Sequence, residues 1–154
     1  MPSTIARTVA PSLGLAMTDL HVLRVESATY GDLTSASLRA RLETFRRTHL
    51  HRQVVVQGTR WRYMLSGQGQ RALVLPAGGT RVPDLYLLLF EALEPEFRIV
   101  APAYPPLTTM AGLVDGITGI LDAERLEQVD ILGSSFGGFV AQCFVRQHTD
   151  RVSR

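Results

Sequence analysis

The chain has 154 residues, 45% of them apolar, which suffices for one domain with its own hydrophobic core. No apolar run approaches the roughly 18 residues that a membrane span needs, so we expect no membrane span. The net charge is +2, with nine arginines against four acids in residues 1–62, but no base-reading motif accompanies them, so we expect a solvated surface and no nucleic-acid partner.

The N-terminal quarter divides into an arm and a helix. Residues 1–33 show no hydrophobic period and are predicted to be a loose arm, whereas residues 34–154 are predicted to form one partial domain. Apolar residues recur at helical spacing at Leu38, Leu42 and Phe45. This spacing predicts an amphipathic helix over residues 35–49.

A hairpin and then alternating strands and helices follow. Two strand patterns at 53–57 and 60–65 flank Gly58-Thr59, which predicts an antiparallel hairpin. The later expected elements are a strand at 71–75, a helix at 84–93, a strand at 97–101 that Pro102 ends, a helix at 109–122, a strand at 128–132 and a helix to about 148. Three glycines within 109–122 argue against a regular helix there. We predict an α/β fold with a mostly parallel sheet, helices on both faces and the hairpin at one side.

The segment Gly133-Ser134-Ser135-Phe136-Gly137 fits the pattern G-x-S-x-G between a predicted strand and a predicted helix. Such a turn holds its serine in strained geometry with Oγ projecting, and it crowds the residues two before and two after the serine. Gly133 and Gly137 avoid that crowding, which favours a nucleophile elbow with Ser135 as the nucleophile. The alternative is a tight strand-to-helix turn without chemistry.

Pro76-Ala77-Gly78-Gly79-Thr80 is a second glycine-rich loop after a predicted strand. An elbow-type site takes one oxyanion donor from the residue after the nucleophile, here the N–H of Phe136, and another from such a loop. Gly78 is the first choice for that donor and Gly79 the second, and a plain turn is the alternative. The loop lacks the Gly-Lys-Ser/Thr of a phosphate-binding loop, and we expect no cofactor and no metal.

Three stretches, LPAGGT at 75–80, AYPP at 103–106 and VDILGSSFGGFVAQ at 129–142, carry a family resemblance. Residues 53–152 resemble the N-terminal half of α/β-hydrolase-fold proteins, and most closely the maspardin group. The resemblance implies strand order 1-2-4-3-5 and onward. It implies a serine hydrolase of a small-molecule ester, thioester or amide, or a non-catalytic scaffold of the maspardin type.

The resemblance also implies that the catalytic acid and histidine follow later strands, so that this chain carries an incomplete triad. His148 lies about 20 Å from Ser135 along a helix, and Asp130 about 16 Å along a strand, too far to replace them. The remaining histidines are expected at the surface: His21, His49 and His51.

An uncovered strand at 128–132 would favour self-association. The single Cys143 indicates a reducing, cytoplasmic compartment. The sequence does not identify the substrate, and an inert fragment is a third reading.

Overall fold

The computed structural model describes residues 35–153. Five strands, four α-helices and two short 3₁₀ helices follow one another along this part of the chain. Their bounds are α1 Ser35–Thr48, β1 His51–Val56, β2 Thr59–Ser66, β3 Arg71–Val74, η2 Pro83–Tyr86, α2 Leu87–Leu93, β4 Phe97–Ala103, α3 Met110–Ala123, β5 Asp130–Ile131, α4 Phe136–Gln147 and η3 Thr149–Arg151.

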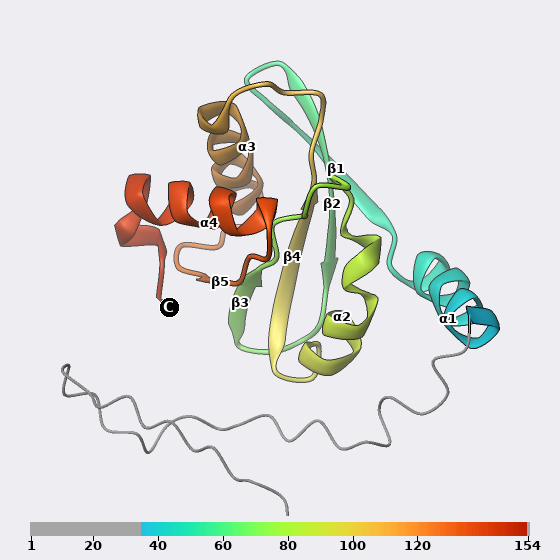
Figure 1. Ribbon diagram of the computed structural model, residues 1–154. Helices are drawn as coiled ribbons and strands as arrows, with labels where there is room; N and C mark the ends of the chain where they lie inside the picture. Colours follow the sequence, from blue (N-terminus) through green and yellow to red (C-terminus); the bar gives the residue numbers. More distant parts are fainter. Residues whose placement is uncertain (1–34, 154) are drawn as a thin grey trace, which may run out of the picture. The chain divides into compact units, whose positions relative to one another are not determined.

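The strands form one mixed sheet in the order β1-β2-β4-β3-β5 (Figure 1). β1 and β2 form the hairpin, and β2 also runs antiparallel to β4. β3 lies between β4 and β5 and runs parallel to both. The predicted α/β class and strand order are confirmed, and the carboxyl ends of β3, β4 and β5 meet at one edge, where their loops gather.

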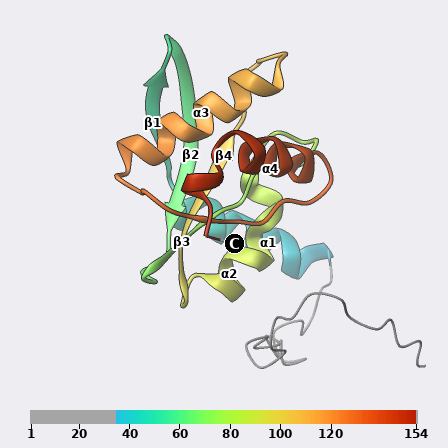
Figure 2. The same cartoon turned by 90° about the vertical axis from the view of Figure 1, so that its left-hand side faces the viewer.

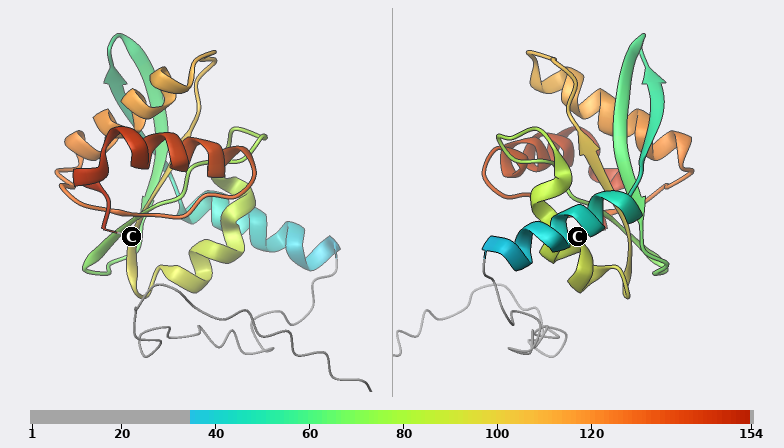
Figure 3. Two further views of the ribbon diagram at one scale, coloured as in Figure 1. Left: turned by 60° about the vertical axis from the view of Figure 1, so that its left-hand side comes forward. Right: turned by 90° about the vertical axis from the view of Figure 1, so that its right-hand side faces the viewer.

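Alternating side chains send two hydrophobic clusters to opposite faces of the sheet. Val74 and Val100 face α3 and α4, in a cluster that also holds Trp61 and Phe144. Leu73 and Ile99, their neighbours in sequence, face α1 and α2 in the other cluster. Figures 2 and 3 show the two helix pairs on the two sides of the strands. Both faces are therefore covered, which explains why the central strands are apolar throughout.

Several boundaries differ from the sequence-based prediction for identifiable reasons. The hairpin turn is Gln57-Gly58 rather than Gly58-Thr59, with φ of 47° and 77°, because a two-residue turn of this kind needs positive φ at both positions. β4 does not stop at Pro102 but runs on to Ala103. Beyond Val100, β4 is paired with β2 and no longer with β3, so its open side tolerates the missing N–H of Pro102.

The glycine-containing segment 109–122 also differs from expectation, because α3 is a continuous helix capped by Thr109 Oγ1, which accepts from Gly112 N at 3.2 Å. Its later glycines allow close packing on the hairpin. A Cβ on Gly116 would lie 1.8 Å from Cζ2 of Trp61, and one on Gly119 would lie 2.5 Å from a Val56 methyl. These glycines serve helix–sheet contact rather than irregularity.

The strand predicted at 128–132 is shorter, and its outer side is partly occupied. The N–H of Val129 donates to Arg151 O at 2.9 Å, and Ser153 N donates to Val129 O at 2.8 Å. Val129 and Val152 thereby form a parallel bridge beside β5. Residues 151–153 thus take the place of a neighbouring strand over one residue pair. Within residues 35–153, no helix is long and apolar enough to cross a bilayer.

Glu124, after α3, gathers partners from three strands. Its carboxylate accepts from Tyr63 Oη at 2.7 Å, Arg52 at 3.0 Å and Arg98 at 2.9 Å. Burial would raise the pKa of Glu124, but the Tyr63 hydrogen bond and the arginines outweigh it and hold the pKa below its usual value of 4.5. Burial, together with the Glu124 hydrogen bond, raises the pKa of Tyr63 to about 12. This network ties the hairpin and β4 to the end of α3.

We expect Glu124→Gln to lower the free energy of unfolding at pH 7 by about 2 kcal/mol, because charged hydrogen bonds are lost. The folded-state pKa of Glu124 lies below 4.5, so its contribution is present above that pH and is lost as the pH falls through the folded pKa. Urea unfolding at pH 7 and pH 3 should therefore show the gap between wild type and variant narrowing in acid. Glu127→Gln, at an exposed neighbouring acid, is the control and should leave the free energy of unfolding unchanged at both pH values. An equal gap at both pH values would contradict this electrostatic account.

Candidate functional site

Ser135 lies between β5 and the first turn of α4, at the edge of the sheet where the parallel strands end (Figure 1). Its φ is 52° and its ψ is −126°, a region that residues with a side chain rarely adopt. The side chain is exposed and makes no capping bond to α4. The backbone is therefore strained at the residue that the motif assigns as nucleophile, and Oγ is left available.

The flanking glycines are required by close backbone contacts. A Cβ on Gly133 would lie 2.3 Å from Gly137 O, which is the crowding across the turn that the motif predicts. A Cβ on Gly137 would instead lie 2.2 Å from Pro76 O, in the loop after β3. Gly138, by contrast, has room, because its Cβ would make an ordinary contact at 3.4 Å. The start of α4 is thus seated directly on the loop that the sequence analysis selected for the oxyanion donor.

The two candidate oxyanion donors are the backbone amides of Gly78 and Phe136. Among residues 35–153, neither Gly78 N nor Phe136 N donates to a protein acceptor. A Cβ on Gly78 would meet nothing within 4 Å, and the same holds for Gly79. The loop is closed on its other side, where Arg81 N donates to Gly78 O at 2.9 Å. The space beside Gly78 is therefore open, as the approach of a bound carbonyl oxygen would require.

Arg81 fixes this loop to the neighbouring one. Its φ is 63°, its carbonyl accepts from Tyr104 N at 2.9 Å, and its guanidinium donates to Pro105 O and to Leu107 O. The AYPP segment after β4 is therefore bound to the loop after β3. The ring of Tyr104 in turn lies edge-on to Phe136, with centroids 5.9 Å apart. Loops after three strands thus converge around the elbow.

No base is in contact with Ser135 in the part of the chain that the structure describes, since no hydrogen bond of its Oγ is present there. His148 ends α4 and pairs with Thr118 Oγ1 of α3 at 3.2 Å, so it joins two helices. Asp130 lies at the opposite end of β5 and pairs with Arg71. Neither residue serves the elbow.

The expectation that His49 and His51 lie at the surface holds only in part, because both are partly buried, while His21 lies outside the described residues. The side chain of His49 is only 14% exposed, stacks on Phe45 and places Nε2 at 2.6 Å from Glu94 Oε1. Nδ1 of His51 is buried and has no hydrogen-bond partner among residues 35–153, and burial and the Arg62 charge lower the pKa of His51, with Asp84 opposing. The sequence pattern missed both because the segments that bury them, η2 and α2, are distant in sequence.

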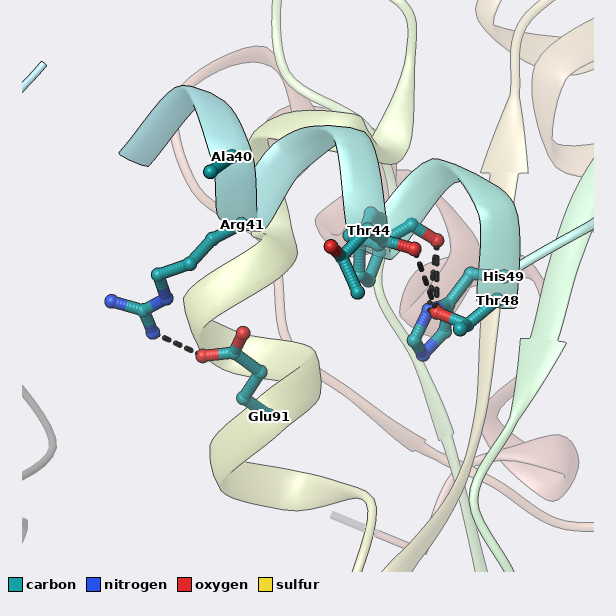
Figure 4. A pocket seen from close by; sticks show the side chains of 7 residues that line it. Ala40, Arg41, Thr44, Thr48, His49 and Glu91 are labelled. Atoms are coloured by element: carbon teal, nitrogen blue, oxygen red, sulfur yellow. Dashed lines mark hydrogen bonds and ion pairs between the residues drawn. The ribbon is translucent and has the colours of Figure 1, made fainter. Parts of the chain in front are cut away.

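A cavity of about 290 Å³ lies between α1 and α2, on the other face of the sheet from α4. Figure 4 shows Arg41 reaching Glu91 across its mouth, with Thr44, Thr48 and His49 along one wall. Its lining consists of Ala40, Arg41, Thr44, Phe45, Thr48, His49 and Glu91. None of these belongs to the elbow or the loop after β3, so this cavity is separate from the candidate site. Within residues 35–153, no group of three or more histidines, cysteines and acids could hold a metal.

Tyr86 is a neighbour of the elbow that the sequence analysis did not single out. It ends η2, and its hydroxyl donates to Pro76 O at 2.9 Å. Burial raises the pKa of Tyr86, and the nearby Ser134 backbone opposes the rise. The hydroxyl of Tyr104 is buried and has no partner among the described residues, and burial raises the pKa of Tyr104 strongly. The Tyr86 link to Pro76 spans 10 residues of sequence and follows no helical or strand period, so only the three-dimensional contact reveals it.

The strand order, the helices on both faces and the strained serine between β5 and α4 are those of the α/β-hydrolase fold, and the chain has this fold.

Comparison with known proteins agrees. The chain is 30% identical over 115 residues to a 2-hydroxymuconate semialdehyde hydrolase of Pseudomonas sp. strain CF600, a match covering 67% of this chain and 41% of that enzyme. The chain therefore spans about two fifths of the length of this curated relative. No family model matches the chain.

Solved structures show the same similarity. A meta-cleavage product hydrolase of Pseudomonas fluorescens IP01 superposes with a TM-score of 0.59 at 27% identity, covering 67% of this chain and 42% of that one. An epoxide hydrolase of Vigna radiata superposes with a TM-score of 0.61 at 23% identity, covering 69% and 37%. The second likeness concerns the fold alone.

Proposed function

We propose that the protein is a serine hydrolase of a small-molecule carbonyl compound, with Ser135 as the nucleophile. The observation that carries the proposal is the strained, exposed Ser135 at φ 52°, at the start of a helix whose Gly137 packs on the loop that holds Gly78. Ser135 Oγ would bond to the carbonyl carbon while Phe136 N–H and Gly78 N–H receive the developing oxyanion. The oxyanion then collapses, expelling the leaving group, and water releases the acyl group from Ser135.

The Oγ proton must pass to a base, and within residues 35–153 no side chain is placed to take it. We therefore propose that the acid and histidine of the triad lie outside these residues, as in the resembled fold. The substrate is assigned by class only, as an ester, thioester, amide or related carbonyl compound. The relative from Pseudomonas is named for hydrolysis of a semialdehyde, which supports a small carbonyl substrate.

The test is covalent labelling of the protein, expressed from its own gene, by a fluorophosphonate probe that phosphonylates activated serines. We expect one labelled serine, Ser135 by peptide mass, and complete loss of labelling in Ser135→Ala. Ser134→Ala is the matched control, because this exposed neighbour lies in the same turn and should leave labelling intact. The isolated 154-residue chain should label at least about a hundredfold more slowly, because a general base is missing.

A non-catalytic scaffold of the maspardin type is the second candidate. Two observations favour it: VDILGSSFGGFVAQ at 129–142 resembles that group, and Ser135 Oγ lacks a base in the described part of the chain. Under this reading the fold persists while Ser135 is inert. Absence of Ser135-dependent labelling in the protein expressed from its own gene, with normal thermal stability, would select the scaffold over the enzyme.

A further inference from the structure

Resting on the proposed function, we propose that Tyr86 is a positioning residue that fixes the two oxyanion donors relative to each other. Its ring packs on the cluster formed by α1, α2 and one face of the sheet, which anchors it on that side. Its hydroxyl then reaches the far side of the loop after β3. Tyr86 touches neither Ser135 Oγ nor either donor amide, so it acts through the backbone that carries them.

The hydroxyl of Tyr86 holds a carbonyl at which two backbone segments, separate in sequence, meet. It donates to Pro76 O at 2.9 Å, and Pro76 O packs against Gly137, where an added Cβ would lie 2.2 Å from it. Pro76 lies two residues before the Gly78 donor, and Gly137 directly follows the Phe136 donor. One phenol therefore holds the contact between two peptide segments, each of which carries a donor.

The phenol chemistry suits this positioning role. A hydroxyl donates one hydrogen bond, so a neutral tyrosine can hold a carbonyl oxygen in place. Phenylalanine keeps the ring packing but cannot donate. Pro76 O also packs against the backbone of Gly137 from the other side, where an added Cβ would lie 2.2 Å from it. Without the Tyr86 hydroxyl, that carbonyl would lose the hydrogen bond and retain only the contact with Gly137.

The experiment compares Tyr86→Phe with Tyr104→Phe by hydrogen exchange and by labelling. Tyr104 is the matched control, since it loses a buried hydroxyl that has no partner among the described residues. We expect Tyr86→Phe to accelerate amide exchange about tenfold in the peptides covering 76–80 and 133–136 and to leave α2 and α3 unchanged. Tyr104→Phe should change neither region. Equal exchange in all three proteins, or a uniform acceleration in Tyr86→Phe, would overturn the positioning role.

Labelling supplies the functional readout. In the protein expressed from its own gene, Tyr86→Phe should lower the rate constant of Ser135 phosphonylation about tenfold while leaving the probe's dissociation constant unchanged, because the donors act on the transition state. A change in the dissociation constant alone would also overturn the proposal. If wild type is not labelled, the proposed function fails, and hydrogen exchange still decides whether Tyr86 holds the two segments together.

Discussion

Gly137→Ala is expected to unfold the site and to destabilise the whole domain. The added Cβ would lie 2.2 Å from Pro76 O and 3.0 Å from Ala77 O, and both are backbone atoms that cannot rotate away. Either α4 or the loop after β3 must shift, although α4 is held by the buried Val140 and Phe144. Overpacking of this kind should cost about 3 kcal/mol and lower the melting temperature by roughly 10 °C.

The control for this change is Gly138→Ala, at the next residue of the same helix. Its Cβ would lie 3.4 Å from Gly133 O, an ordinary contact, and alanine is the better helix former. Thermal unfolding followed by circular dichroism should therefore give Gly138→Ala a melting temperature at or slightly above that of wild type. If Gly137→Ala had the same melting temperature as Gly138→Ala, the loop after β3 would not pack against α4 as described. Fluorophosphonate labelling of Ser135 should be lost in Gly137→Ala and retained in Gly138→Ala.

The elbow could be predicted from sequence because its determinants are local. Gly133, Ser135 and Gly137 lie within five residues, between a strand and a helix that periodicity alone identifies. The alternation of short apolar strands with helices predicted the α/β class, whereas the strand order came from the family resemblance. Residues whose role depends on distant neighbours could not be predicted in this way. Tyr86 reaches Pro76 O, and His49 packs edge-on to Phe90, only after the sheet has brought α2 beside the other segments.

The glycines of α3 show most clearly why propensity misleads. Glycine weakens a helix by about 1 kcal/mol, so three of them argue against a regular one. The structure shows a continuous helix, because Gly116 lets α3 approach Trp61, which is only 1% exposed. Propensity describes an isolated helix, whereas here the packing of the hairpin against α3 decides the outcome. Gly116 therefore weakens α3 as an isolated helix but stabilises the packing of α3 on the hairpin. A substitution can separate these two effects.

Gly116→Ala is expected to destabilise the protein even though alanine favours helix. Its Cβ would lie 1.8 Å from Trp61 Cζ2 and 2.0 Å from Cε2, and the indole is enclosed, with Tyr104 edge-on at 6.3 Å. We expect a net loss of about 2 kcal/mol in urea unfolding, from an overpacking cost of about 3 kcal/mol less the gain of about 1 in helix propensity. Gly112→Ala is the control within the same helix, because its nearest neighbour is Thr109 Oγ1 at 3.1 Å, and its stability should differ from wild type by less than about 1 kcal/mol.

A double-mutant cycle with Trp61→Phe tests the cause of this loss. The contacts of the Gly116 Cβ are with atoms of the six-membered ring of the indole, Cε2, Cζ2 and Cη2, and a smaller phenyl ring at residue 61 would free part of that space. Trp61→Phe alone should destabilise by leaving a cavity. The double variant should then be more stable than the sum of the two losses predicts, by at least about 1 kcal/mol. Strict additivity would mean that the indole does not oppose the alanine, and that the glycine is needed for the backbone of α3 instead.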